Sequence, residues 1–297
     1  MKILSAVAIF SLLLTIPLLV PFVSPAFSQT PVATAEPTDL SHLLAAVRAK
    51  ATALESNSTM RAGFASFASA HKMPPGALRY SDYVLVRLLF EATWDAGFWN
   101  MHWNITDQPH NSDRIWAQWK SVARPSFVQQ TATAECDELS ALLAFLVQRS
   151  GVKGVGLFWP YPNHTVAVWT VHPRNAQPVR VVIPTSQIFL TEDDTFDTKK
   201  FNPSHQKTIY DYTRRDVPDS FELPKPLFDF FLQQMEKYAG ASPDALQQLR
   251  NLRDGVLQKT LTPEEAAREA LRRRAAFSSS PEDVAAFQYF ADDLRKP

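Results

Sequence analysis

Midway along the chain the spacing of apolar residues changes from a helical period to the two-residue period of β-strands. Thr133 is a suitable N-cap for a leucine-rich helix, and Gly151 supplies the left-handed residue that ends it. Strands are predicted at 152–159, 165–171 and 179–183, because these runs are rich in valine and aromatic residues and are bounded by turn residues. Three antiparallel strands packed on one helix make an α+β core, which we assign to residues 126–218.

Helical patterns flank this core on both sides. Behind a candidate cap at Asp39, leucine and valine recur at helical spacing, and residues 39–125 are predicted to be mainly helical. Residues 219–297 return to helices, because a hydroxyl residue followed by proline and early carboxylates marks a helix start. Three such starts are present, at Ser242-Pro243, Thr262-Pro263 and Ser280-Pro281.

The first residues have the composition of a secretory signal segment. One positive charge is followed by an apolar run, and small residues at 26–28 suit cleavage before Gln29. The alternative is an uncleaved membrane anchor, which Pro17, Pro21 and Pro25 would interrupt. We therefore predict a signal peptide at 1–28, a flexible leader at 29–38 and a secreted or periplasmic protein.

The charge balance disfavours several classes of partner. The chain has 30 Lys and Arg and 30 Asp and Glu residues, so no net field draws it to nucleic acid or to acidic lipid. No second apolar run is long enough to span a membrane, which limits membrane contact to the signal segment before cleavage. No phosphate-binding glycine loop is present, and no cofactor is expected.

The single cysteine, Cys136, requires an explanation in an exported protein, because it cannot form an internal disulfide. It falls in the first turn of the predicted helix, where unpaired N–H groups and the helix dipole stabilise a thiolate. The carboxylates of Glu135, Asp137 and Glu138 oppose a further negative charge, so activation needs an imidazolium partner. His164, at the start of the second predicted strand, is the best candidate. The alternative is a small buried cysteine with a packing role.

Three segments resemble the transglutaminase-like superfamily: 135–143 (ECDELSALL), the helix end Gly151-Val152, and 164–169 (HTVAVW). The resemblance implies a papain-like α+β fold and acyl transfer through a thioester, with Cys136 as nucleophile and His164 as general base. The substrates would be peptide or isopeptide amides, with water or an amine as acceptor. Members usually carry an aspartate before Pro-Thr on the next strand, whereas this sequence has Ile183 at that position.

Strand register suggests which residue replaces the missing carboxylate. If Val171 pairs with Val179 across the connecting loop, the residues near the level of His164 are Thr185 and Gln187. A neutral side-chain oxygen can hold the imidazole tautomer, as an amide does in papain-like enzymes. Gln187 is the first choice and Thr185 the second.

The tetrahedral intermediate of acyl transfer also needs donors for its oxyanion. The main-chain N–H of Cys136 is one candidate. Gln130 lies six residues before the cysteine, which resembles the position of the side-chain donor in papain-like proteases. The alternative for Gln130 is a solvated loop residue.

Other constellations are weaker. A metal site at His102, Asp107, His110 and Asp113 lacks recurrent ligand spacing, and no metal is predicted. The basic run 268–274 is interpreted as a solvated helix face. A second functional class is a catalytically inactive transglutaminase-like module that binds peptide or a cell-surface polymer, and Ile183 is its strongest support.

Overall fold

The computed structural model describes residues 37–104, 114–161, 164–184, 210–211 and 217–295, with only the main chain at 160, 161, 164, 210 and 211. The predicted signal segment 1–28 and most of the leader 29–38 lie outside these residues. Of the residues that the structure describes, 57% are helical and 13% are in strands, which is consistent with the predicted α+β class. Every described element belongs to the unit that begins at Pro37.

The central sheet has four antiparallel strands in the order β5-β4-β3-β6. Their bounds are β3 (Val155–Tyr161), β4 (His164–Val171), β5 (Val179–Ile183) and β6 (Tyr210–Asp211). The predicted register holds, because Val171 lies opposite Val179 and Ala167 opposite Ile183. The strand β6 was not predicted, since a two-residue strand carries no periodic signal.

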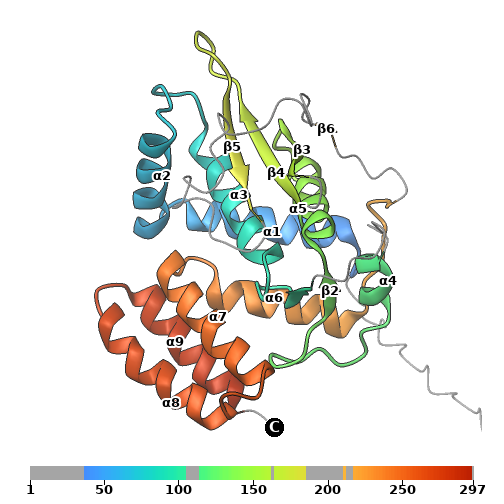
Figure 1. Ribbon diagram of the computed structural model, residues 1–297, viewed down its shortest axis with the longest axis vertical. Helices are drawn as coiled ribbons and strands as arrows, with labels where there is room; N and C mark the ends of the chain where they lie inside the picture. Colours follow the sequence, from blue (N-terminus) through green and yellow to red (C-terminus); the bar gives the residue numbers. More distant parts are fainter. Residues whose placement is uncertain (1–36, 105–113, 162–163, 185–209, 212–216, 296–297) are drawn as a thin grey trace, which may run out of the picture. The chain divides into compact units, whose positions relative to one another are not determined.

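The cysteine-bearing helix α5 (Cys136–Arg149) packs against β3 and β4 (Figure 1). Alternation along β4 divides its side chains between the two faces of the sheet. Ala167 and Trp169 join the main hydrophobic core together with α5, whereas Val166 and Val168 pack with Phe158 and Val182 in a separate buried cluster. The helix ends as predicted, with Gly151 at a φ of 97°.

The N-terminal helices are α1 (Leu40–Leu54), α2 (Ser58–Ala70), α3 (Tyr80–Thr93) and the short α4 (Arg114–Lys120). Asp39 caps α1, as expected, and its side chain accepts a 3.0 Å hydrogen bond from the N–H of His42. The helix α3 contacts both α1 and α5, and so carries the N-terminal layer to the core. Its residues from Tyr83 onward are buried on every side, which is typical of a helix enclosed by other elements.

Two three-residue strands connect the N-terminal helices to α5. The strands β1 (Met101–Trp103) and β2 (Ala132–Ala134) pair in parallel, with His102 opposite Thr133. The strand β2 leads directly into Glu135 and α5, so this pair fixes where the helix begins. Neither strand was predicted, because three residues are too few to show alternation.

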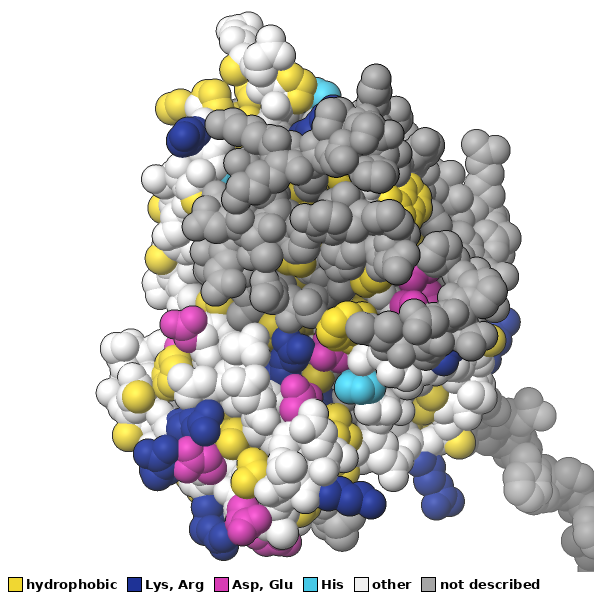
Figure 2. All heavy atoms as spheres, in the orientation of Figure 1, with side chains coloured by type: hydrophobic (Ala, Val, Ile, Leu, Met, Phe, Trp, Pro, Cys, Tyr) yellow, Lys and Arg dark blue, Asp and Glu magenta, His cyan; other side chains and the backbone are white. Residues whose placement is uncertain are grey.

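The C-terminal helices are α6 (Lys225–Tyr238), α7 (Pro243–Leu257), α8 (Pro263–Arg273) and α9 (Pro281–Leu294), with a 3₁₀ turn at Arg274–Phe277. The last three begin at the predicted hydroxyl caps, and each of these side chains accepts a main-chain N–H. In Figure 2, acidic and basic side chains are interspersed over this part of the surface. Arg272 and Arg273 both donate hydrogen bonds to the Glu269 carboxylate, which is consistent with the predicted solvated helix face at 268–274.

None of the helices in the described part of the chain is both long enough and apolar enough to cross a bilayer.

Candidate functional site

Cys136 is the first residue of α5, so the prediction that it lies in the first turn is confirmed. The predicted N-cap is wrong, however, because Glu135 rather than Thr133 occupies that position. The Glu138 carboxylate accepts a 2.8 Å hydrogen bond from the N–H of Glu135, which is one half of a capping box. The helix therefore starts two residues later than the capping preference of threonine suggested.

Thr133 cannot cap the helix because its polar groups are engaged within β2. Its N–H donates to Oε1 of Gln118 at 2.8 Å, and its carbonyl accepts from Nε2 of the same side chain at 3.0 Å. Its hydroxyl accepts a 3.2 Å hydrogen bond from Arg114. Two side chains of α4 thus hold β2 extended up to the cysteine.

The thiol of Cys136 is half-buried against the start of β4. Burial raises its pKa, and the carboxylates of Asp137 and Glu135 add to the increase. Hydrogen bonds from the main chain of Thr165 and of Asp137 act in the opposite direction but do not overcome the burial. These surroundings keep the thiol protonated at neutral pH, so a nucleophilic role requires a further cationic group.

The helix is also joined to β4 one turn further along. The Ser140 hydroxyl donates a 3.2 Å hydrogen bond to the carbonyl of Thr165, and both residues are fully enclosed. Two residues of α5 therefore contact the main chain of Thr165, the residue after His164. The main chain of His164 opens β4 opposite Tyr161, while its imidazole lies outside the described residues.

The position at which the resemblance expects an aspartate is occupied by an aliphatic side chain. Ile183 is completely buried and joins the main core opposite Ala167, so the residue at the usual aspartate position contributes no polar group. The described register stops at this pair. The two predicted orienting residues, Thr185 and Gln187, lie outside the described residues, and their role stays a prediction.

Gln130, the predicted oxyanion donor, is exposed at the end of the segment that precedes β2. The next residue, Thr131, is fixed instead: its N–H donates to the Asn100 carbonyl at 2.9 Å, and its hydroxyl to the Trp99 carbonyl. Asn100 in turn donates to the carbonyls of Ser126 and Gln129. The main chain on both sides of Gln130 is therefore anchored, while its side chain faces solvent.

Sequence reasoning missed a buried cluster of charges beside β1. The carboxylate of Asp95 accepts a 2.5 Å hydrogen bond from the N–H of Trp103 and a 2.8 Å hydrogen bond from Arg250. Nδ1 of His102 lies 3.4 Å from the same carboxylate. No local signal predicts this cluster, because Arg250 lies 155 positions from Asp95.

The described residues offer no metal centre. Asp107, His110 and Asp113 of the weak metal motif lie outside them, and His102 contacts Asp95 instead. Within the described ranges, no group of three or more His, Cys, Asp or Glu side chains is arranged to hold an ion.

Comparison of the chain with protein-family models, with curated proteins and with solved structures found no match. The transglutaminase-like assignment therefore stays a prediction from the sequence.

Proposed function

We propose that this chain is an exported thiol enzyme of transglutaminase-like fold that acts on peptide or isopeptide amides through an acyl-enzyme at Cys136. Its substrates are proteins or peptides, including those of the cell envelope. The observation that carries the proposal is the position of the only cysteine at the first residue of a buried helix. Its sulfur accepts a hydrogen bond from the main chain of Thr165, the residue that follows His164.

The proposed reaction has two steps. His164 removes the thiol proton, the sulfur attacks the amide carbonyl, and the C–N bond breaks as the imidazolium returns the proton to the leaving amine. Water or a second amine then attacks the thioester and releases Cys136. Water as acceptor gives a peptidase, and an amine gives an acyltransferase.

Oxyanion stabilisation is assigned to groups close to the cysteine in sequence. The N–H of Cys136 is at the first position of α5, where helix N–H groups have no intrahelical acceptor. Gln130 is the proposed side-chain donor. Gln187, or otherwise Thr185, is proposed to orient His164 with a neutral oxygen.

A specific observation supports the second candidate, an inactive module that binds peptide or a cell-surface polymer. The described surroundings raise the pKa of Cys136, chiefly through burial, and Ile183 fills the position of the carboxylate that would stabilise an imidazolium. The two candidates therefore differ in whether His164 lowers the thiol pKa enough to reverse the effect of burial.

Alkylation of the thiol across pH distinguishes the two candidates. The chain has one cysteine, so every labelling event reports on Cys136. For an enzyme, the alkylation rate of the wild type should rise with an apparent pKa below about 8.5, the ordinary value for cysteine. His164→Ala should move that apparent pKa above the ordinary value, whereas His172→Ala, which changes an exposed histidine, should leave it unchanged.

A wild-type thiol that titrates above its ordinary pKa and does not respond to His164→Ala would contradict the enzyme and favour the binding module.

A further inference from the structure

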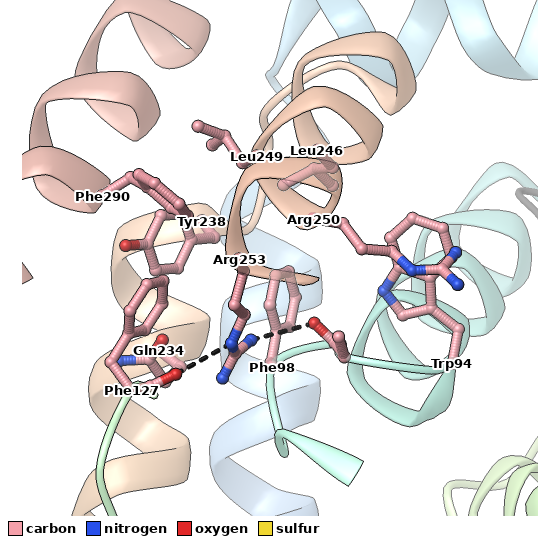
Figure 3. A pocket seen from close by; sticks show the side chains of 12 residues that line it. Trp94, Phe98, Phe127, Gln234, Tyr238, Leu246, Leu249, Arg250, Arg253 and Phe290 are labelled. Carbon is pink, nitrogen blue, oxygen red and sulfur yellow. Dashed lines mark hydrogen bonds between the residues drawn. The ribbon is translucent and has the colours of Figure 1, made fainter. Parts of the chain in front are cut away.

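A pocket lies among α6, α7, α9 and the turn segment 94–98, outside the elements that hold Cys136 (Figure 3). Most of its lining is aromatic or aliphatic: Trp94, Phe98, Phe127, Leu246, Leu249 and Phe290. Such a lining with a few polar groups is the usual composition of a small-molecule site.

Arg253 of α7 is the polar group that makes this pocket unusual. The residue is 4% exposed, and its guanidinium lies 4.4 Å from the centre of the Phe127 ring. Nε donates to the carbonyl of Phe127 at 2.8 Å, and Nη1 to the carbonyl of Ala96 at 3.0 Å. Nη2 has no hydrogen-bond partner in the described part of the chain. A buried cation with an unused donor is costly to leave unpaired.

The carboxylates near Arg253 are held by other cations. Asp95 pairs with Arg250 at 2.8 Å, and Asp293 with Lys237 at 2.6 Å. Asp254 has Arg250 at 3.9 Å. Among the described residues no acid forms an ion pair with Arg253 itself, which leaves its positive charge to be matched by something else.

Gln234 of α6 provides a second polar group. It is 3% exposed and lines the same pocket. Figure 3 shows Gln234 and Arg253 together with Phe127 on one side of the pocket, with the hydrophobic side chains of α7 and α9 above them. The pocket thus combines one charged donor and one neutral amide with an apolar wall.

We propose that this pocket binds a short-chain aliphatic carboxylate. One carboxylate oxygen accepts a hydrogen bond from Nη2 of Arg253, and the amide of Gln234 donates to the other. The alkyl chain lies against the aromatic and leucine side chains. The ligand class follows from the donors: a carboxylate matches a guanidinium in both charge and geometry, and an alcohol or an amide matches only the hydrogen bond.

Isothermal titration with butyrate tests the proposal, with butyramide and butanol as neutral ligands of similar size. The folded protein should bind butyrate saturably, with a dissociation constant on the order of millimolar for so small a ligand, and at least about tenfold more tightly than either neutral compound. Leu249→Phe, which fills the pocket and keeps it apolar, should weaken butyrate binding at least tenfold. Arg268→Met, which removes an exposed arginine, should not alter it.

Arg253→Met removes the proposed donor but also two hydrogen bonds to main-chain carbonyls, so it is informative only if the variant folds. Gln234→Leu and Leu249→Phe keep those bonds and are the decisive variants. Equal binding of butyrate and butyramide, butyrate binding that is unaffected by Leu249→Phe, or the absence of saturable binding to the folded wild type would each overturn the proposal.

Discussion

The main-chain N–H of Thr165 donates a hydrogen bond to the sulfur of Cys136, so this hydrogen bond joins the first residue of α5 to the second residue of β4. Serine preserves this contact, because a hydroxyl oxygen accepts the same bond, but it is a far poorer nucleophile. Cys136→Ser should therefore abolish any acyl transfer while changing the free energy of unfolding by less than about 1 kcal/mol. Turnover of a peptide amide and urea unfolding measure the two effects. Unchanged turnover would exclude the thiol mechanism.

Replacing Ile183 tests whether its position can accept a carboxylate. The side chain is completely buried in the core, so Ile183→Asp should destabilise the protein by about 3 kcal/mol or more through an unpaired buried charge. The control Ile183→Val keeps the site apolar and should cost only about 0.5–1.5 kcal/mol. Urea unfolding compares them. An aspartate variant as stable as the valine variant, with a more reactive thiol at neutral pH, would mean that the carboxylate has found the imidazole.

A buried ion pair within α3 should respond differently to single and double replacement. Arg87 and Glu91 are each 2% exposed and lie 2.7 Å apart, and Arg87 also donates to the carbonyl of Ala241 at 3.2 Å. Glu91→Leu leaves a guanidinium without its partner and should cost about 3–5 kcal/mol. The double variant Arg87→Met with Glu91→Leu should recover at least half of that loss in urea unfolding. Additive losses would mean that the two charges do not stabilise each other.

The N-cap of α1 should make stability depend on pH below neutrality. Partial burial raises the pKa of Asp39, but hydrogen bonds from Ser41 and His42 outweigh it and lower the value to about 2. Since the folded pKa is lower than the ordinary value of 3.8, the cap stabilises the fold above about pH 4 and loses this effect as pH falls toward 2.

Asp39→Ala should consequently lower the free energy of unfolding by about 1 kcal/mol at pH 7, and by much less at pH 2.5. Asp229→Ala is the matched control, because its carboxylate is half-exposed and pairs with Lys225 on the helix surface. Denaturant unfolding at both pH values measures the difference. An equal loss at the two pH values would mean that the ionised cap is not what stabilises α1.

Local chemistry explains which elements could be predicted from the sequence. The starts of α7, α8 and α9 were predictable because a hydroxyl cap and the following proline lie within a few residues of each other. The strands β4 and β5 were predictable because they are long enough to show their composition. The register followed from the loop that joins them, since Val171 and Val179 close it.

The remaining features depend on residues that are far apart in the sequence. Thr133 has the chemistry of an N-cap, yet Gln118 and Arg114 bind its polar groups first, so the helix begins after Glu135. Similarly, nothing near Arg253 in the sequence indicates that its guanidinium reaches the carbonyl of Ala96. The cysteine site was accessible to sequence reasoning because Cys136 is unique, whereas the arginine pocket was not.

The two carbonyls bonded by Arg253 have a consequence for folding during synthesis. Phe127 and Ala96 precede their donor by 126 and 157 residues, so the segments on either side of β1 are complete only after α7 has left the ribosome. Until then, the turn segment 94–98 and the approach to β2 have main-chain acceptors that only water can satisfy.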